Sequence, residues 1–229
     1  MAEGGVCVRR TPSGGLRLGE LRKAVLDAAL EMEKLGLVRG TSGNVSARDP
    51  GTGFIAVTPS GLPYRDLGPQ DIVVVDASGA VAEGERRPSS ETPMHAAIYR
   101  ARPNVAAIVH THSPFATAFS VMNRDLPAIT VPLALLGEVA VLPFRLPGSD
   151  ELAAVVAEAF RQGGSCFLLQ NHGAVFGGPG LRKALDAAVY VEEGAQVACH
   201  VLAAGGDLAP IPEDVARQMR QAAREGKLL

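Results

Sequence analysis

Hydrophobic residues recur at three- and four-residue steps in several stretches of the chain, and this spacing predicts amphipathic helices. In the first of them, Gly36 stands where a helix would end in the left-handed conformation. In the second, Pro93 suits the first helical position, with Thr92 as the residue that caps it. The predicted helices cover residues 18–35, 94–102, 115–122, 150–160 (capped by Ser149), 181–204 and 213–225.

Shorter apolar runs lie between these helices and predict β-strands. They cover residues 54–58, 71–76, 79–82, 105–109, 126–129, 139–142, 166–172 and 174–176, and a short alternating segment ends at Arg48. Residues 71–76 and 79–82 form a predicted hairpin. Strands that alternate with helices but include hairpins favour a mixed or antiparallel sheet layered with helices, an α/β fold. No linker or repeat divides the chain, so we expect a flexible tail (1–17) and a single domain (18–229).

Composition and charge exclude several classes of protein. A chain of 229 residues can bury about 70–75% of its surface in one large core without a stabilising metal or disulfide. Its three cysteines are widely spaced and form no Cys-x-x-Cys pair, which favours a reducing, cytoplasmic compartment. The first residues carry no signal-like apolar stretch, and no run is long enough to span a bilayer. With a formal net charge of −2 and no basic stripe, we expect no nucleic-acid or membrane partner.

Two histidines one residue apart close the apolar run at 105–109. Side chains at positions i and i+2 of a strand share a face, so His110 and His112 are expected to point at one place. Two imidazoles that converge suit zinc, which binds nitrogen at roughly 2.0–2.1 Å and needs at least one more protein ligand. The simpler interpretation is a pair of ordinary surface histidines.

The best third ligand is His172, because it ends the buried-type strand at 166–172 and precedes a glycine, as His112 ends its own strand. His95 and His200 lie inside predicted helices. We expect these two to be helix-face histidines whose rings are satisfied by a carbonyl group or water.

Three loops rich in glycine and hydroxyl groups could hold an anion. They are GTSGNVS (residues 40–46), TPSG (58–61) and PSSET (88–92). Glycine lets backbone N–H groups approach a ligand closely, and the third loop enters a helix, whose free N–H groups favour negative charge. Alone, these loops are better explained as a turn that enters a strand and as a helix cap.

Together with His110-Thr111-His112 and Asn171-His172-Gly173, these loops strongly resemble the class II sugar-phosphate aldolase family, which includes L-fuculose-1-phosphate aldolase and L-ribulose-5-phosphate 4-epimerase. The resemblance runs from about Leu18 to beyond Gly205. It implies zinc ligation by His110, His112 and His172, and by Glu91 when no substrate is bound, with Glu91 as the catalytic acid or base. It also implies that the substrate phosphate is held by Gly43, Asn44, Ser60, Gly61, Ser89 and Ser90.

The family fold is a three-layer α/β/α domain around a mostly antiparallel sheet, usually assembled as a homotetramer with sites at subunit interfaces. The resemblance therefore implies a zinc-dependent enzyme acting on a small phosphorylated sugar. Three neutral imidazoles leave the ion its full charge, so it can stabilise an enediolate. The expected reaction is reversible cleavage of a ketose 1-phosphate, as in L-fuculose-1-phosphate aldolase, to dihydroxyacetone phosphate and a small aldehyde.

The sequence departs from the family at two functional positions, and one of them is a functional tyrosine that the family tends to carry near its carboxyl end. Aldolases of the family supply a tyrosine in the segment that aligns with Thr130-Val131-Pro132, and the only tyrosines here are Tyr64, Tyr99 and Tyr190. An L-ribulose-5-phosphate 4-epimerase is the alternative, although that enzyme usually carries aspartate in place of Glu91. A non-catalytic interaction module on the same fold and a zinc hydrolase are further alternatives. Retention of the histidines and Glu91 disfavours the module, and a hydrolase leaves the hydroxyl-rich loops unexplained.

Overall fold

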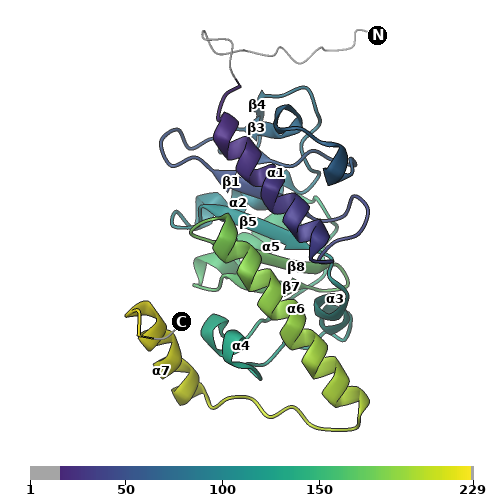
Figure 1. The fold of residues 1–229 in the computed structure, drawn as a ribbon, viewed down its shortest axis with the longest axis vertical. Helices are drawn as coiled ribbons and strands as arrows, with labels where there is room; N and C mark the ends of the chain where they lie inside the picture. The colour runs from purple at the N-terminus through teal and green to yellow at the C-terminus, as the bar shows by residue number, and fades with distance from the viewer. Residues whose placement is uncertain (1–15, 228–229) are drawn as a thin grey trace.

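The computed structural model describes residues 16–227 and is centred on an eight-stranded sheet (Figure 1). The strand order is β4-β3-β2-β1-β5-β8-β7-β6, and neighbours are antiparallel except for the parallel pair β6 and β7. The strands are β1 (Asn44–Arg48), β2 (Ile55–Val57), β3 (Val73–Val75), β4 (Val81–Glu83), β5 (Ala107–Thr111), β6 (Val141–Leu142), β7 (Cys166–Leu169) and β8 (Gly173–Gly178). The predicted mostly antiparallel sheet is confirmed.

Helices cover both faces of the sheet and give three α/β/α layers. They are α1 (Gly19–Lys34), α2 (Thr92–Ala101), α3 (Pro114–Val121), α4 (Val131–Leu136), α5 (Asp150–Arg161), α6 (Leu181–Ala203) and α7 (Glu213–Arg224), with 3₁₀ turns η1 (Tyr64–Asp66) and η2 (Pro69–Asp71). One core cluster packs α1, α3, α4, α6 and α7 on one face, where Figure 1 shows α1 and α6 crossing the strands. The second cluster packs α2 and α5 on the other face. The predicted fold class is therefore confirmed.

Strand β5 lies near the middle of the sheet and is buried on both faces. Ala107 and Val109 pack in the α1 and α6 layer, and Ile108 packs in the α2 and α5 layer. This double burial explains why residues 105–109 read as an uninterrupted apolar run, because a central strand has no solvent-facing side. It also means that a polar side chain on β5, such as His110, lies in the interior.

Two predicted helix ends are confirmed. Gly36 has φ +72°, and the N–H groups of Gly36 and Leu37 donate to the carbonyl groups of Glu33 and Met32, a Schellman ending for α1. The Ser149 hydroxyl accepts from the N–H of Leu152 at 3.1 Å and caps α5.

Other local predictions are wrong. The cap of α2 is Glu91, not Thr92, which is the first residue of the helix. The segments at 126–129 and 139–142 form only one isolated bridge, between Leu126 and Val139, and the two-residue strand β6. Between them lies α4, which the hydrophobic pattern did not predict. Its signal is local: the Thr130 side chain accepts from the N–H of Leu133 at 3.4 Å, and a proline stands in the first turn.

Most of the predicted tail, with Cys7, lies outside the described residues. Arg17 is described, and its backbone N–H donates to Glu83 Oε1 at 3.0 Å. The two cysteines in the described part, Cys166 and Cys199, are not disulfide-bonded. Within residues 16–227, every helix is too short or too polar to span a bilayer.

Candidate metal and substrate site

Three separate segments meet at the carboxyl end of the central strand β5 and bring the candidate ligands together. His110 is near the end of β5, beside Asn44 at the start of β1. His112 follows β5, and its backbone N–H donates to the Leu37 carbonyl at 3.2 Å, which holds this residue against the loop after α1. Glu91 occupies the N-cap position of α2, and its side chain bonds no N–H group of that helix.

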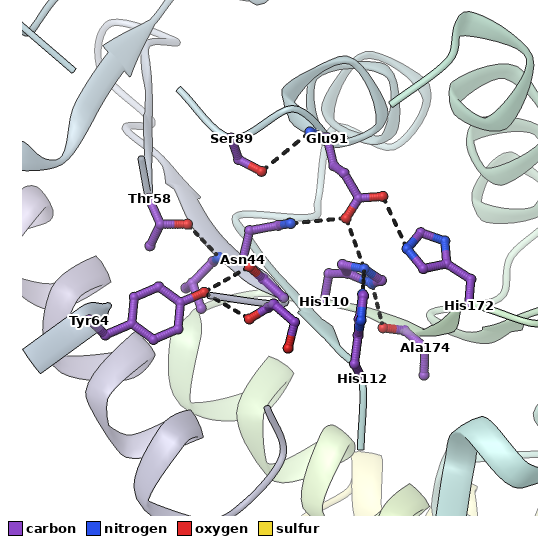
Figure 2. A network of polar contacts seen from close by, with 12 residues as sticks. Asn44, Thr58, Tyr64, Ser89, Glu91, His110, His112, His172 and Ala174 are labelled. Carbon is purple, nitrogen blue, oxygen red and sulfur yellow. Dashed lines mark hydrogen bonds and ion pairs between the residues drawn. The ribbon is translucent and has the colours of Figure 1, made fainter. Parts of the chain in front are cut away.

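The turn between β7 and β8 places His172. Asn171 adopts φ +56°, a left-handed conformation that asparagine tolerates better than most residues. Gly173 starts β8 so close to β5 that a Cβ there would lie 2.2 Å from the Thr111 carbonyl oxygen. The Asn-His-Gly sequence therefore allows a tight hairpin, and its middle residue points at the end of β5 (Figure 2).

The three predicted histidines surround one point. Their ring centroids lie 4.8–4.9 Å apart in every pair, and the ligand atoms of His110, His112, His172 and Glu91 all lie within 4.8 Å of one another. The Nε2 atoms of His110 and His112 are 2.9 Å apart. Glu91 Oε2 lies 2.8 Å from His110 Nε2, and its Oε1 lies 3.4 Å from His172 Nε2.

Hydrogen bonding fixes the direction of His110. Its Nδ1 lies 2.9 Å from the carbonyl oxygen of Ala174, which can only accept, so the proton is on Nδ1. Nε2 is therefore the nitrogen that faces the cluster, and it donates to the Glu91 carboxylate, which together with the Ala174 carbonyl raises the pKa of His110 against the effect of burial. A metal ion bound at Nε2 would replace that proton.

Burial and mutual charge set the ionisation of the cluster. Burial alone would raise the pKa of Glu91, but His110, then His172 and the Asn44 amide, hold that pKa below its ordinary value. Burial, then His110 and His172, lowers the pKa of His112 to about 3. Burial and His110 lower the pKa of His172 to about 4. At neutral pH, Glu91 is therefore a carboxylate, and His112 and His172 are neutral ligands.

The donor set fits a divalent metal ion. Among the described residues, Glu91 Oε1 is buried inside the cluster without a hydrogen-bond partner, 3.4 Å from His172 Nε2, and such an oxygen is costly to bury unless something else binds it. Neutral imidazole nitrogen and carboxylate oxygen are ligands that zinc accepts. These four residues can hold such an ion.

A cleft of 240 Å³ opens beside the cluster. Its lining includes Glu91, His112 and His172, and it contains every residue predicted to hold phosphate: Gly43, Asn44, Ser60, Gly61, Ser89 and Ser90. Thr41, Ser42, Pro59 and Pro147 complete the wall, and no lysine or arginine of residues 16–227 lines it. An anion in this cleft would therefore meet hydroxyl and backbone N–H donors. The assignment of these residues to phosphate stays a prediction.

Two of the cleft glycines need positive φ. Gly43 has φ +72°, and a Cβ there would lie 2.5 Å from Val38 Cγ1 and 2.7 Å from the His110 carbonyl oxygen. Gly61 also has φ +72° but has open space where a Cβ would stand. Gly43 is thus required by both conformation and packing, whereas Gly61 is required by conformation alone.

Sequence reasoning missed three contributions to the site. The Asn44 amide, predicted to contact phosphate, donates to Glu91 Oε2 at 3.0 Å (Figure 2). The Tyr64 hydroxyl donates to the Gly43 carbonyl at 2.8 Å and supports the first loop. Pro147 lines the cleft from the segment before α5. These contacts join residues distant in the chain, and no local pattern indicates them.

None of the chain's tyrosines offers a free hydroxyl to this cleft. Tyr64 and Tyr99 are buried, each with its hydroxyl bonded within the chain, and Tyr190 lies on α6 away from the cleft lining. In the segment where the resemblance implies a tyrosine, Thr130-Val131-Pro132, Val131 is 47% exposed at the start of α4.

The remaining histidines stay outside the cluster, as predicted. His95 is buried in α2, and its Nδ1 lies 2.7 Å from the Ser46 hydroxyl, so its partner is a side chain and not the expected carbonyl group or water. His200 lies near the exposed end of α6, with its ring 5.9 Å from that of Phe115.

Comparison with known proteins places this geometry in a family. The model described as "Class II Aldolase and Adducin N-terminal domain" matches residues 23–199. The L-fuculose phosphate aldolase of Escherichia coli (strain K12) is 40% identical over 186 residues, which cover 80% of this chain and 85% of that protein. The 5-deoxy-D-ribulose 1-phosphate aldolase of Bacillus thuringiensis serovar kurstaki is 36% identical over 177 residues, which cover 77% of this chain and 83% of that protein.

A solved structure titled L-fuculose 1-phosphate aldolase superposes with a TM-score of 0.86 at 31% identity, covering 91% of this chain and 98% of that one. The sequence match and the fold agree with the resemblance carried by the five motifs. The chain belongs to the class II aldolase family.

Proposed function

We propose that the protein is a metal-dependent aldolase that reversibly cleaves a ketose 1-phosphate to dihydroxyacetone phosphate and a small aldehyde. The observation that carries this proposal is the position of the Glu91, His110, His112 and His172 cluster beside a cleft lined by neutral hydrogen-bond donors. The two curated relatives are named as aldolases of ketose 1-phosphates, which favours cleavage over epimerisation.

Zinc is the proposed ion, held by His110, His112 and His172, with Glu91 as a further ligand in the absence of substrate. When bound, such an ion polarises a ketone oxygen and stabilises the negative charge that develops on it as a neighbouring bond breaks. The tautomer of His110, fixed by the Ala174 carbonyl, supports this assignment.

Glu91 is the proposed proton carrier. Its carboxylate is ionised, reaches the cleft and sits at the edge of the histidine cluster, so it can accept a proton from a substrate hydroxyl or carbon held there. Asn44 binds Oε2 through its amide and leaves Oε1 without a partner in the described chain. We assign Asn44 mainly to the orientation of Glu91.

Ser60, Ser89 and Ser90, with the backbone N–H groups around Gly43 and Gly61, are proposed to bind the phosphate. The Ser89 hydroxyl oxygen accepts from the N–H of Glu91 at 3.2 Å, which leaves its hydrogen free to donate to a ligand. A phosphate fixed in this way would hold the reacting carbon next to Glu91 and the histidines.

The family description names adducin beside the class II aldolases. The competing proposal is therefore that this chain is a non-catalytic interaction module with the same fold. An interaction module has no use for three imidazole nitrogens and a carboxylate that converge in the interior. A module should purify without stoichiometric metal, whereas the proposed enzyme should hold about one ion per chain.

We further propose that the protein assembles as a homotetramer with the cleft at a subunit interface, following the family resemblance. Light scattering after size-exclusion chromatography measures the mass directly. A monomeric mass in the active preparation would contradict this part of the proposal.

A substrate screen tests the function. L-Fuculose 1-phosphate, 5-deoxy-D-ribulose 1-phosphate and L-ribulose 5-phosphate would be incubated with the zinc-loaded protein and the products identified by NMR. Dihydroxyacetone phosphate from one of the two 1-phosphates is the expected result. Conversion of L-ribulose 5-phosphate to its 4-epimer without release of a three-carbon product would instead establish the epimerase.

A further inference from the structure

A row of polar side chains crosses the otherwise apolar interface between β1 and α2. On β1, Asn44, Ser46 and Arg48 share the face that meets α2. On α2, Glu91, His95 and Tyr99 are spaced at four-residue steps and therefore lie on one stripe of the helix. We call these six residues the β1–α2 polar row.

The two sets are joined in matching order. Asn44 binds Glu91 at 3.0 Å; the Ser46 hydroxyl lies 2.7 Å from His95 Nδ1 and 2.8 Å from the Tyr99 hydroxyl. Arg48 donates to the Tyr99 carbonyl at 3.0 Å. Ser46 is thus the centre of the row, and its contact with His95 lies next to the contact between Asn44 and Glu91.

The direction of the central hydrogen bonds follows from the available partners. Among the described residues, the buried Tyr99 hydroxyl has only Ser46 as a side-chain partner, so Tyr99 donates to Ser46, and Ser46 donates to His95 Nδ1. The ring proton of His95 is then on Nε2, which has no hydrogen-bond partner in the described part of the chain. Burial, then repulsion from His110, lowers the pKa of His95 to about 3, so the ring is neutral and can accept. Every hydroxyl hydrogen of the row is thereby used.

The surroundings make this arrangement sensitive to small shifts. Ile55, Val57, Ile98 and Ile108 belong to the same interface and offer no polar partner. In such a medium, a buried polar group that loses its hydrogen bond is costly. Sliding α2 along β1 would break the row at every step, so the row fixes one register of the helix on the strand.

Glu91 caps α2, so the position of the helix decides where its carboxylate lies. We infer that Ser46 and His95 are positioning residues that hold Glu91 at the histidine cluster by fixing the register of α2 on β1. The test of this inference by kcat rests on the proposed aldolase reaction. The test by zinc affinity does not rest on it.

The test is a double-mutant cycle. Ser46→Ala would be made in the wild-type and Glu91→Gln backgrounds, with Ser120→Ala as a control that also removes a buried hydroxyl, one bonded only within α3. In the wild-type background, Ser46→Ala should lower kcat between about 10- and 100-fold with KM nearly unchanged. It should weaken zinc binding, measured by chelator competition, by between about 3- and 10-fold.

In the Glu91→Gln background, both effects of Ser46→Ala should shrink to within about 2-fold, because the group that it positions is already lost. Ser120→Ala should change neither quantity in either background. Ser46→Cys keeps the side-chain volume but bonds weakly, and it serves as the second variant if the alanine variant unfolds. It should behave as Ser46→Ala does.

Equal effects of Ser46→Ala in the two backgrounds would overturn the inference, as would effects no larger than those of Ser120→Ala. If the wild-type protein turns over no ketose phosphate, the proposed reaction fails. The cycle measured by zinc affinity still decides whether the row positions Glu91.

Discussion

Two buried carboxylates in the described chain have different neighbours: Glu83 lies beside a guanidinium group, and Glu91 lies beside three imidazoles. Glu83 is 5% exposed and lies 2.7 Å from the guanidinium of Arg22, which is itself fully buried. Arg22 also donates to the carbonyl groups of Arg17 and Ile72, and Glu83 accepts from the backbone of Arg17. Glu83 Oε2 accepts no hydrogen bond from the described residues and lies 3.7 Å from Arg17 Nε, so both cationic neighbours of this carboxylate are guanidinium groups.

Glu91, also 5% exposed, faces three imidazoles that converge on it. One of its oxygens and one nitrogen of His172 have no partner among the described residues. A carboxylate that faces guanidinium groups, which cannot ligate a metal, serves the fold, whereas a carboxylate that meets three imidazole nitrogens can share a metal ion with them. Burial and unfilled hydrogen bonds do not separate the two sites, because Glu83 Oε2 also lacks a hydrogen-bond partner among the described residues. The chemistry of the facing groups does separate them.

Among the substitutions that test this comparison, a change at His172 is expected to have the largest effect on metal binding and turnover. His172→Ala removes one of three imidazoles, so bound zinc should fall from about one ion per chain to a small fraction and turnover should fall to background. Metal analysis after gel filtration measures this loss. His200→Ala, on the exposed end of α6, is the matched control and should keep both metal and activity. Full zinc content in His172→Ala would remove that residue from the metal site.

Glu91→Gln tests the proposed proton carrier. The amide keeps the shape but cannot take up a proton, so kcat should fall between about 100- and 10,000-fold, while the fold is retained and the three histidines still bind zinc, with lower affinity. Steady-state kinetics with a ketose 1-phosphate, together with metal analysis, makes the measurement. Turnover near the wild-type rate would exclude Glu91 from the mechanism.

Glu83→Gln should give the opposite profile. It leaves the Arg22 charge buried without its counterion, which should lower the free energy of unfolding by about 3–5 kcal/mol. Zinc content and kcat should stay unchanged at temperatures where the variant is folded. Urea unfolding followed by circular dichroism compares it with Glu91→Gln, which should lose less stability. If Glu91→Gln were the less stable variant, the distinction between the two carboxylates would be wrong.

The smallest expected effect belongs to the phosphate loops. Ser90→Ala removes one neutral donor to a charged ligand, which should raise KM for the phosphorylated sugar about 10-fold and leave the unphosphorylated sugar unaffected. Ser78→Ala, at an exposed turn between β3 and β4, is the control. Equal losses for both sugars would show that Ser90 does not bind the phosphate.

The fold was predictable where a pattern is local and repeated. Burial on both faces makes β5 an uninterrupted apolar run, and the ends of α1 and α5 carry their own signals at Gly36 and Ser149. Helix α4 was missed because its six residues are too few to show a helical period. Glu91, not Thr92, occupies the N-cap position of α2, and its hydrogen bonds with the Ser89 hydroxyl and the Asn44 amide are contacts that no one-dimensional pattern contains.

In the candidate site, too, some features could be predicted from local sequence patterns and others could not. His110, His112 and His172 could be identified because each stands at the end of an apolar run. The contacts that hold Glu91 and Gly43 in place come from Asn44 and Tyr64, which lie 47 and 21 residues away in the chain. Only the fold brings such pairs together. The β1–α2 polar row was likewise invisible, because its members look like ordinary strand and helix residues until the register is known.

The most direct test of the central claim is a zinc titration of the metal-free protein, with release of dihydroxyacetone phosphate from a ketose 1-phosphate followed at each step. We predict that the rate rises in proportion to added zinc and levels off at about one ion per chain. The His172→Ala variant should stay inactive throughout. Release of dihydroxyacetone phosphate at the full rate by the metal-free protein would contradict the account.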